Sequence, residues 1–274
     1  YKIPLNKTLS DLSKQDQSHF RVYNTVLSTF NEAGTSYFVP SIGGYHAAKL
    51  GKYQDVVDIY FSQDPRLKQY GIKDETGLIN VLNMLNTKYI LHGDVTQPQI
   101  EQNPTALGNA WFTPNVKWTE NANDEILAIN STQLANTVIL RKDLVENKQF
   151  KPAADATAKI ELVEYSPMKI TYKSSSNTDQ FAVFSEVYYP HGWTASIDGK
   201  NVPIEKANYI LRALPISKGQ HTIIFEYQPQ IIATGNTIVI ISNILLLLVV
   251  AGGIYLGYKQ CSQKENEKLA TEKA

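Results

Sequence analysis

The sequence has almost no cysteine, because Cys261 is the single one among 274 residues. Residues 1–260 can therefore form no disulfide and offer no thiol, which excludes a disulfide scaffold and cysteine-dependent catalysis for that part. If this part is exported, the lack of cysteine is unusual for an animal secreted domain and favours a bacterial envelope protein.

The sequence also has no excess of charge of either sign, since 26 Lys and Arg residues balance 26 Asp and Glu residues. A neutral chain has no electrostatic reason to bind nucleic acid, and we expect no nucleic-acid partner. Hydrophobic residues make up 43% of the chain, so it can bury a core in one or two domains.

Charge is missing from one long segment near the C-terminus. No charged residue occurs between Glu226 and Lys259, and residues 237–258 are mostly apolar. A helix needs roughly 20 apolar residues to cross a bilayer, so we predict a transmembrane helix at 237–258. A buried helix of a soluble core is the alternative, but an uncharged run of this length disfavours it.

The basic residues around this segment predict its orientation. Only Lys218 occurs in the roughly twenty residues before it, and several lysines follow. The positive-inside rule therefore predicts a cytoplasmic tail at 259–274, with residues 1–235 extracytoplasmic. We expect the bacterial inner membrane as the location and its lipid bilayer as a partner.

Residues 1–150 have the pattern of a mixed α+β region. Apolar residues recur at helical spacing over 46–61 and 75–85, which predicts two helices. Short apolar runs predict strands, at residues 20–24, 88–91, 116–118, 125–129 and 137–140.

Residues 151–230 have the pattern of an antiparallel β-sandwich. Short runs of alternating residues are separated by turn residues, at 158–164, 169–172, 180–188, 193–197, 201–204, 208–214 and 221–227. Asp198-Gly199 predicts a type I′ hairpin turn, which needs positive φ at both central residues. The predicted fold class is thus an α+β part (1–150), a β-sandwich (151–230), a transmembrane helix (237–258) and a tail (259–274).

No motif in the sequence predicts chemistry. The five histidines have no metal-ligand spacing, and no Gly-x-Ser-x-Gly elbow is present, although residues far apart in sequence could still form a Ser-His-Asp arrangement. Gly43-Gly44 lacks the Gly-Lys-Ser/Thr of a phosphate loop. We predict no catalytic residue, no metal site and no cofactor.

Two pairs of carboxylates are candidates for glycoside hydrolysis. Asp55 and Asp58 fall on one side of a predicted helix, as solvated helix faces also do. Glu186 lies in a predicted strand, and turn chemistry alone explains Asp198. We therefore assign neither pair to catalysis.

An aromatic cluster near one end of the sandwich is the best candidate for ligand binding. Sugars stack on aromatic rings while polar side chains bind their hydroxyls. The candidate carbohydrate-binding residues are Tyr188, Tyr189, Trp193, Tyr209 and Arg212, with Tyr45 and His46 as a weaker pair. The alternative is that Trp193 and some of the tyrosines belong to the core.

Several blocks of the sequence resemble one family in content and order. They are residues 20–23, 43–49, 85–90, 188–204, 207–209 and 219–229, together with Arg212. These blocks resemble the C-terminal end of YfhO-like bacterial membrane proteins, in the version found in Bacteroidetes.

This resemblance implies a polytopic parent protein, grouped with GT-C-type glycosyltransferases that use lipid-linked sugars to modify envelope polymers or lipids. The acidic catalytic residue of such enzymes lies in an outer loop that would precede Tyr1, so no catalytic residue carries over. We expect a non-catalytic C-terminal portion, with the parent's upstream membrane helices and an envelope glycan or lipid-linked sugar as partners. A membrane-anchored glycan-binding module and a domain that packs on partner membrane proteins remain alternatives.

Overall fold

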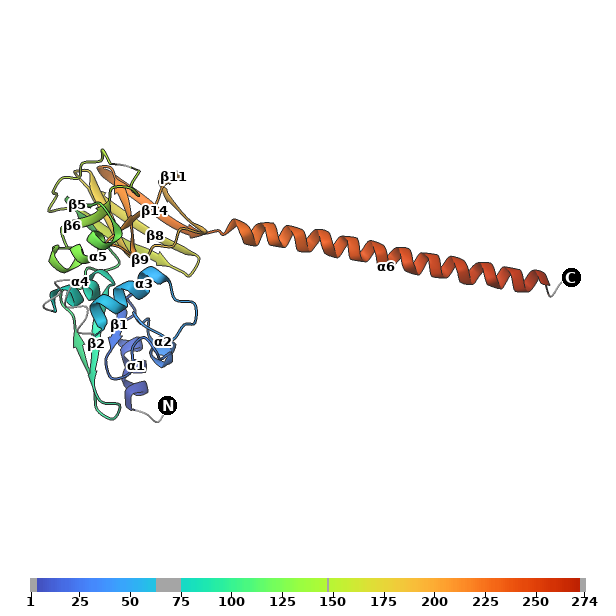
Figure 1. The fold of residues 1–274 in the computed structure, drawn as a ribbon, viewed down its shortest axis with the longest axis horizontal. Coiled ribbons are helices and arrows are strands. Elements are labelled where there is room, and N and C mark those ends of the chain that lie inside the picture. Colours follow the sequence, from blue (N-terminus) through green and yellow to red (C-terminus); the bar gives the residue numbers. More distant parts are fainter. Residues whose placement is uncertain (1–3, 63–74, 147, 272–274) are drawn as a thin grey trace. The chain divides into compact units, whose positions relative to one another are not determined.

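The computed structural model describes residues 4–62, 75–146 and 148–271. The chain divides into two units, Tyr1–Tyr227 and Gln228–Ala274, and each is described by itself. In the first unit, helices and a small sheet come from the N-terminal part, and two larger sheets come mainly from later residues (Figure 1).

The small sheet and two helices enclose a core of their own. Helix α1 (Pro4–Gln15) buries leucines at i, i+4 and i+7, which lie on one helical face. Strand β1 (Arg21–Asn24) pairs in parallel with β2 (Thr87–Gly93), and β2 pairs antiparallel with β3 (Pro98–Gln102). Helix α2 (Gly34–Phe38) completes this part. The buried residues are Leu5, Leu9, Leu12, Phe20, Val22, Val39 and Leu91.

The helix predicted over 46–61 is shorter than expected. Helix α3 (Gly51–Val56) continues as a π-helical turn, η1 (Val57–Phe61), while residues 46–50 form a loop. This loop has its own hydrogen bonds, because the imidazole of His46 accepts the backbone N–H of Ala48. The second predicted helix is confirmed as α4 (Thr76–Met84), which leads into β2.

The prediction of a strand at 125–129 is wrong, because this segment is part of helix α5 (Ala122–Ser131). The side chain of Asn121 caps the helix by accepting the N–H of Asp124, and Asp124 and Glu125 lie in the first turn, where acidic residues favour a helix. An apolar run this short has no clear period, and the capping residues decide the structure.

Two sheets face each other in the strand-rich part. The larger has six strands in the order β4-β9-β13-β12-β6-β5, and the smaller has five in the order β11-β10-β14-β8-β7. The six-stranded sheet comprises β4 (Ala110–Thr113), β5 (Asn115–Thr119), β6 (Thr137–Arg141), β9 (Gln180–Val187), β12 (Glu205–Ala207) and β13 (Leu211–Ile216). The five-stranded sheet comprises β7 (Lys159–Tyr165), β8 (Lys169–Ser176), β10 (Trp193–Ile197), β11 (Lys200–Val202) and β14 (Gly219–Tyr227).

The six-stranded sheet is a middle layer with a core on each face. One core, which includes Phe184 and Phe225, fills the space between the two sheets. The other core, which includes Ile129 and Leu140, packs the opposite face against α4 and α5. Hydrogen bonding in this sheet joins strands from both sides of residue 150, where the sequence predicts a domain boundary.

Two turns show where the local prediction works and where it does not. Asp198 and Gly199 have φ values of 51° and 78°, which confirms the predicted hairpin turn. The strand predicted at 208–214 begins only at Leu211, because Asn208 and Tyr209 take left-handed φ values of 47° and 70°. These two residues form the connection between β12 and β13.

The second unit contains helix α6 (Gln230–Thr271). Within it, Gln230–Gln260 is long and apolar enough to cross a membrane, by length and composition. The fold class is confirmed: helices and mixed strands come first, then mostly antiparallel sheets, then one apolar C-terminal helix.

Candidate functional site

The structure divides the candidate residues into two groups on opposite faces of strand β9. Consecutive strand residues point to opposite faces of a sheet. At the end of β9, the side chain of Glu186 forms an ion pair with Arg21. The next residue, Val187, lines two cavities that are described below. Trp193 and Arg212 belong to the buried group. Tyr188, Tyr189, Tyr209 and His46 line the cavities.

Arg212 is held by aromatic rings and is only 3% exposed. Its guanidinium carbon lies 4.1 Å from the ring centre of Trp193 and 5.5 Å from that of Phe225, which is cation–π geometry. Nε donates to the Val187 carbonyl at 3.1 Å, while Nη1 has no hydrogen-bond partner among the described residues. Burial lowers the pKa of Arg212, and the carboxylate of Glu186 opposes that shift.

Glu186 lies in a network that joins the first strand of the chain to the sandwich. Arg21 Nη2 donates to Glu186 Oε1 at 2.9 Å, and Arg21 Nη1 donates to the carbonyls of Leu85 and Ser185. Burial favours a raised pKa for Glu186, but His19, Arg21 and Arg212 outweigh it and lower the pKa to about 2. His19 Nε2 lies 3.8 Å from Oε1, beyond hydrogen-bond range. Arg212 is therefore packed between the rings of Trp193 and Phe225 and near the Glu186 carboxylate.

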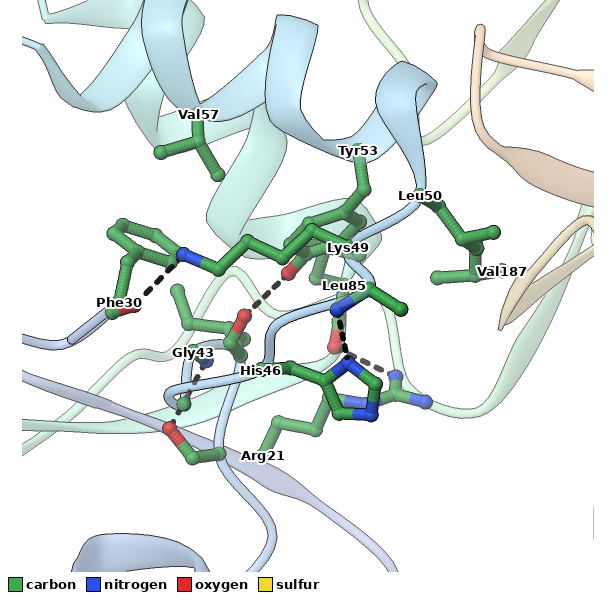
Figure 2. A pocket seen from close by; sticks show the side chains of 14 residues that line it. Arg21, Phe30, Gly43, His46, Lys49, Leu50, Tyr53, Val57, Leu85 and Val187 are labelled. Carbon is green, nitrogen blue, oxygen red and sulfur yellow. Dashed lines mark hydrogen bonds between the residues drawn. The ribbon is translucent and has the colours of Figure 1, made fainter. Parts of the chain in front are cut away.

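The first cavity, of about 340 Å³, lies between the loop that precedes α3 and the ends of neighbouring strands (Figure 2). The conformation of this loop depends on the two consecutive glycines, Gly43 and Gly44. A Cβ on Gly43 would lie 2.1 Å from the Thr29 carbonyl oxygen, and Gly44 has a φ of +126°, so neither position accepts a side chain without a shift. The cavity is lined by Arg21, Phe30, Ser41, Ile42, Gly43, Gly44, His46, Ala48, Lys49, Leu50, Tyr53, Val57, Leu85 and Val187.

Polar atoms at the first cavity are positioned by bonds to the backbone. Tyr53 donates its hydroxyl proton to the Ile42 carbonyl at 2.5 Å, and Lys49 Nζ donates to the Phe30 carbonyl at 2.8 Å (Figure 2). Burial raises the pKa of Tyr53 to about 12, so its hydroxyl stays neutral. Lys49 therefore keeps further N–H donors for a ligand, whereas the single hydroxyl proton of Tyr53 is already donated.

The second cavity, of about 350 Å³, is lined by three of the residues that the sequence predicts for sugar binding, Tyr188, Tyr189 and Tyr209. Tyr188 is partly exposed and Tyr189 is 37% exposed, so both can offer a ring face to a ligand. The ring of His191 packs edge-on against Tyr189, with centroids 5.4 Å apart. The lining also includes Leu50, Gly51, Lys52, Tyr53, Arg141, Leu144, Val187, Pro190, Lys206, Tyr209 and Ile210.

Tyr209 lines this cavity but is not a free stacking surface. Lys52 and Lys206 lie 4.8 and 4.6 Å from its ring centre. Its hydroxyl donates to Asp55 at 2.5 Å and accepts from Lys52 at 2.9 Å. Burial and the bond to Asp55 raise its pKa. Tyr209 therefore shapes the wall and orders Lys52.

A buried carboxylate holds Tyr209 in its left-handed conformation. Glu125 is 0% exposed; it accepts the backbone N–H of Tyr209 at 2.9 Å and pairs with Lys206 at 3.2 Å. Asn208 bonds the backbone of Ile139 with its side-chain oxygen and with its own N–H. Sequence reasoning missed this role of Glu125, although the Asn121 cap could have predicted the helix that carries it.

The two cavities are neighbours, because they share three lining residues. Leu50, Tyr53 and Val187 line both, and the segment 46–53 runs along one side of the pair. We call these two neighbouring cavities together the groove. Tyr45 is 70% exposed and is not among the residues that line it.

One arrangement has the residues of a catalytic triad. His221 Nδ1 lies 2.6 Å from Asp198 Oδ2, and His221 Nε2 lies 3.4 Å from the Ser217 hydroxyl. Nε2 is equally close, at 3.4 Å, to the Lys218 carbonyl, which only accepts hydrogen bonds, and Asp198 also accepts the N–H of Thr222. We therefore interpret these contacts as a brace between the β10–β11 turn and β14.

The paired aspartates line a third cavity, of about 400 Å³, but each already has a partner. Asp55 accepts from Tyr209, and Asp58 accepts from Gln54. Among the described residues, no group of three His, Cys, Asp or Glu side chains could hold a metal ion. The residues that line the groove include no Asp or Glu, so they supply no pair of carboxylates for acid and base catalysis.

These features define a strand-rich domain with a candidate ligand groove, followed along the chain by one helix able to cross a membrane. Residues 156–239 match the family model described as bacterial membrane protein YfhO. The match includes β7 to β14 and the beginning of α6, and it supports a YfhO-like bacterial membrane protein. No curated protein and no solved structure matches the chain.

Proposed function

We propose that this chain is the extracytoplasmic region and last membrane helix of a longer YfhO-like protein of the GT-C glycosyltransferase type, similar to those of Bacteroidetes. Its groove holds a glycan while the upstream membrane helices of the parent transfer a lipid-linked sugar onto an envelope polymer or lipid. The chain itself supplies no catalytic group. Residues 1–235 lie outside the inner membrane and residues 259–274 in the cytoplasm.

The observation that carries this proposal is the aromatic groove. The partly exposed Tyr188 and the exposed Tyr189 line the same cavity as Lys52 and His191, which is the combination of stacking surfaces and polar groups that binds sugars. The family match supports the membrane setting.

Glycan binding is tested with the whole chain in lipid nanodiscs on an array of neutral and acidic glycans. We expect binding to at least one envelope-type glycan and loss of that binding in Tyr189→Ala with unchanged thermal unfolding. Tyr45→Ala is the matched control, because this tyrosine is exposed outside the groove. Absence of binding to every glycan would refute the role of the groove.

The orientation is tested by cysteine labelling in Cys261→Ser, which removes the native thiol. A cysteine at Lys148, an exposed residue of the first unit, should react with a membrane-impermeant maleimide in intact spheroplasts. A cysteine at Ser262 should react only after permeabilisation. The reverse pattern would contradict the extracytoplasmic placement.

The non-catalytic role is tested with a radiolabelled lipid-linked sugar. The parent protein should transfer the label to an acceptor, whereas the chain described here should not. Turnover by this chain alone would overturn the proposal that chemistry belongs to the upstream helices.

A further inference from the structure

The groove consists of two adjacent cavities whose linings differ in chemistry. Each cavity, at about 340 and 350 Å³, is near the lower end of the roughly 300–1,000 Å³ typical of ligand sites. Because Leu50, Tyr53 and Val187 belong to both linings, the two cavities are adjacent, and a ligand that occupied both would cross these residues.

The second cavity is the stacking end. Its accessible rings are Tyr188 and Tyr189, while Lys52 and Lys206 pack close to the ring of Tyr209. A sugar unit here gains most from contact between its CH face and a tyrosine ring.

The first cavity is the donor end. His46 Nδ1 accepts the Ala48 N–H at 3.0 Å, so in the neutral ring the proton lies on Nε2, which is a donor. Lys49 uses one of its three donors on the Phe30 carbonyl and retains the others.

Lys49 also differs from the other cations of the groove in its partner. Arg21, Lys52, Arg141 and Lys206 pair with Glu186, Asp55, Asp143 and Glu125, respectively. The bond described for Lys49 goes to a neutral carbonyl, and the residues that line the two cavities include no carboxylate. The His46–Lys49 end therefore favours a ligand group with negative charge.

We infer that the groove binds an oligosaccharide, with one unit stacked on Tyr188 and Tyr189 and an acidic unit beside His46 and Lys49. This inference rests on the proposed glycan binding and adds the length and the charge of the glycan. Leu50 is the crossing point between the two units, and at 40% exposure it can be replaced without disturbing the core.

The test is a calorimetric titration of the whole chain in nanodiscs with acidic glycans from the array, as single sugars and as two- to six-unit chains. Each acidic chain is matched by its neutral methyl ester. We expect affinity to rise at least about tenfold from one unit to three. The acidic form should bind about two- to fivefold more tightly than its ester, and salt should weaken this preference.

Three variants separate the ends of the groove. Lys49→Gln should abolish the preference for the acidic chain, whereas Lys148→Gln, an exposed lysine outside the groove, should keep it. Leu50→Trp should block the crossing, so that longer chains bind no better than single sugars.

The outcomes distinguish this inference from the function on which it rests. Binding that is sensitive to Tyr189→Ala but independent of chain length, or of Lys49, overturns the inference and leaves glycan binding intact. No binding by any chain length overturns both.

Discussion

The two faces at the end of β9 differ: the side chain of Glu186 belongs to a packed charge network, whereas Val187 and the two tyrosines after it line the groove. On the face of Glu186, Arg212 is buried against the rings of Trp193 and Phe225, and the partly buried Arg21 pairs with the Glu186 carboxylate. On the face of Val187, the tyrosines next along the chain line an open groove. We call the face of Glu186 the closed face, because its charged side chains are packed inside the domain. We call the face of Val187 the open face, because its groove is available for a ligand. Substitutions on the two faces should therefore affect different properties.

Removing the first 150 residues should have the largest effect, because it takes partners from both faces. A chain of residues 151–230 lacks β4, which pairs with β9, and β6, which pairs with β12. It also lacks Arg21, the ion-pair partner of Glu186. We expect no cooperative thermal transition by circular dichroism, in contrast to residues 1–230. A cooperative transition in the short chain would support a folding boundary at residue 150.

Arg212→Ala should have the next largest effect, and this effect should be on the free energy of unfolding and not on glycan binding. It removes a buried side chain that fills the space over Trp193 and Phe225, and we expect a loss of about 2–4 kcal/mol in the free energy of unfolding. Urea unfolding measures this change. Tyr189→Ala on the open face should change stability by no more than about 0.5 kcal/mol. Equal losses in both variants would contradict the division into two faces.

Acid should weaken the closed face through Glu186. Its pKa is lowered in the folded state from 4.5 to about 2, so its stabilising effect is complete above the unfolded pKa and is lost as pH falls from about 5 to 2. The lost contribution is at most about 3 to 4 kcal/mol, because the pKa falls from 4.5 to about 2 and each pKa unit corresponds to 1.36 kcal/mol. Unfolding measured between pH 7 and 3 should show a smaller acid dependence in Glu186→Gln than in the wild type. An identical dependence would show that Glu186 is not the titrating group.

The smallest effect on stability and the largest on binding should come from the open face. Tyr189→Ala removes a stacking surface, and we expect at least about a tenfold loss of glycan affinity, or 1.4 kcal/mol. Tyr45→Ala should bind normally, which calorimetry can check. If Tyr45→Ala lost binding as well, the ligand would lie outside the groove.

The elements predicted well are those whose signal is local. Asp198-Gly199 requires positive φ whatever surrounds it, and the uncharged run before Lys259 is visible in the sequence alone. The apolar run at 125–129 is ambiguous by itself, so the strand prediction failed where the Asn121 cap determines a helix.

The site could be predicted only in part. The sequence indicates that aromatic residues gather near Tyr188, but it does not separate Arg212, buried between rings, from Tyr189, exposed in the groove. The groove depends on packing residues 46–53 against residues 187–191, and the pair of Arg21 with Glu186 spans 165 positions. Such distant contacts leave no periodic pattern in the sequence.

Hydrogen–deuterium exchange of the whole chain in nanodiscs, with and without the tightest-binding glycan, tests the groove most directly. The two-unit binding mode predicts slower exchange in residues 46–53 and 187–191 together, with β10 and β13 unchanged. Slower exchange in only one of these two segments, or in neither of them, would contradict this binding mode.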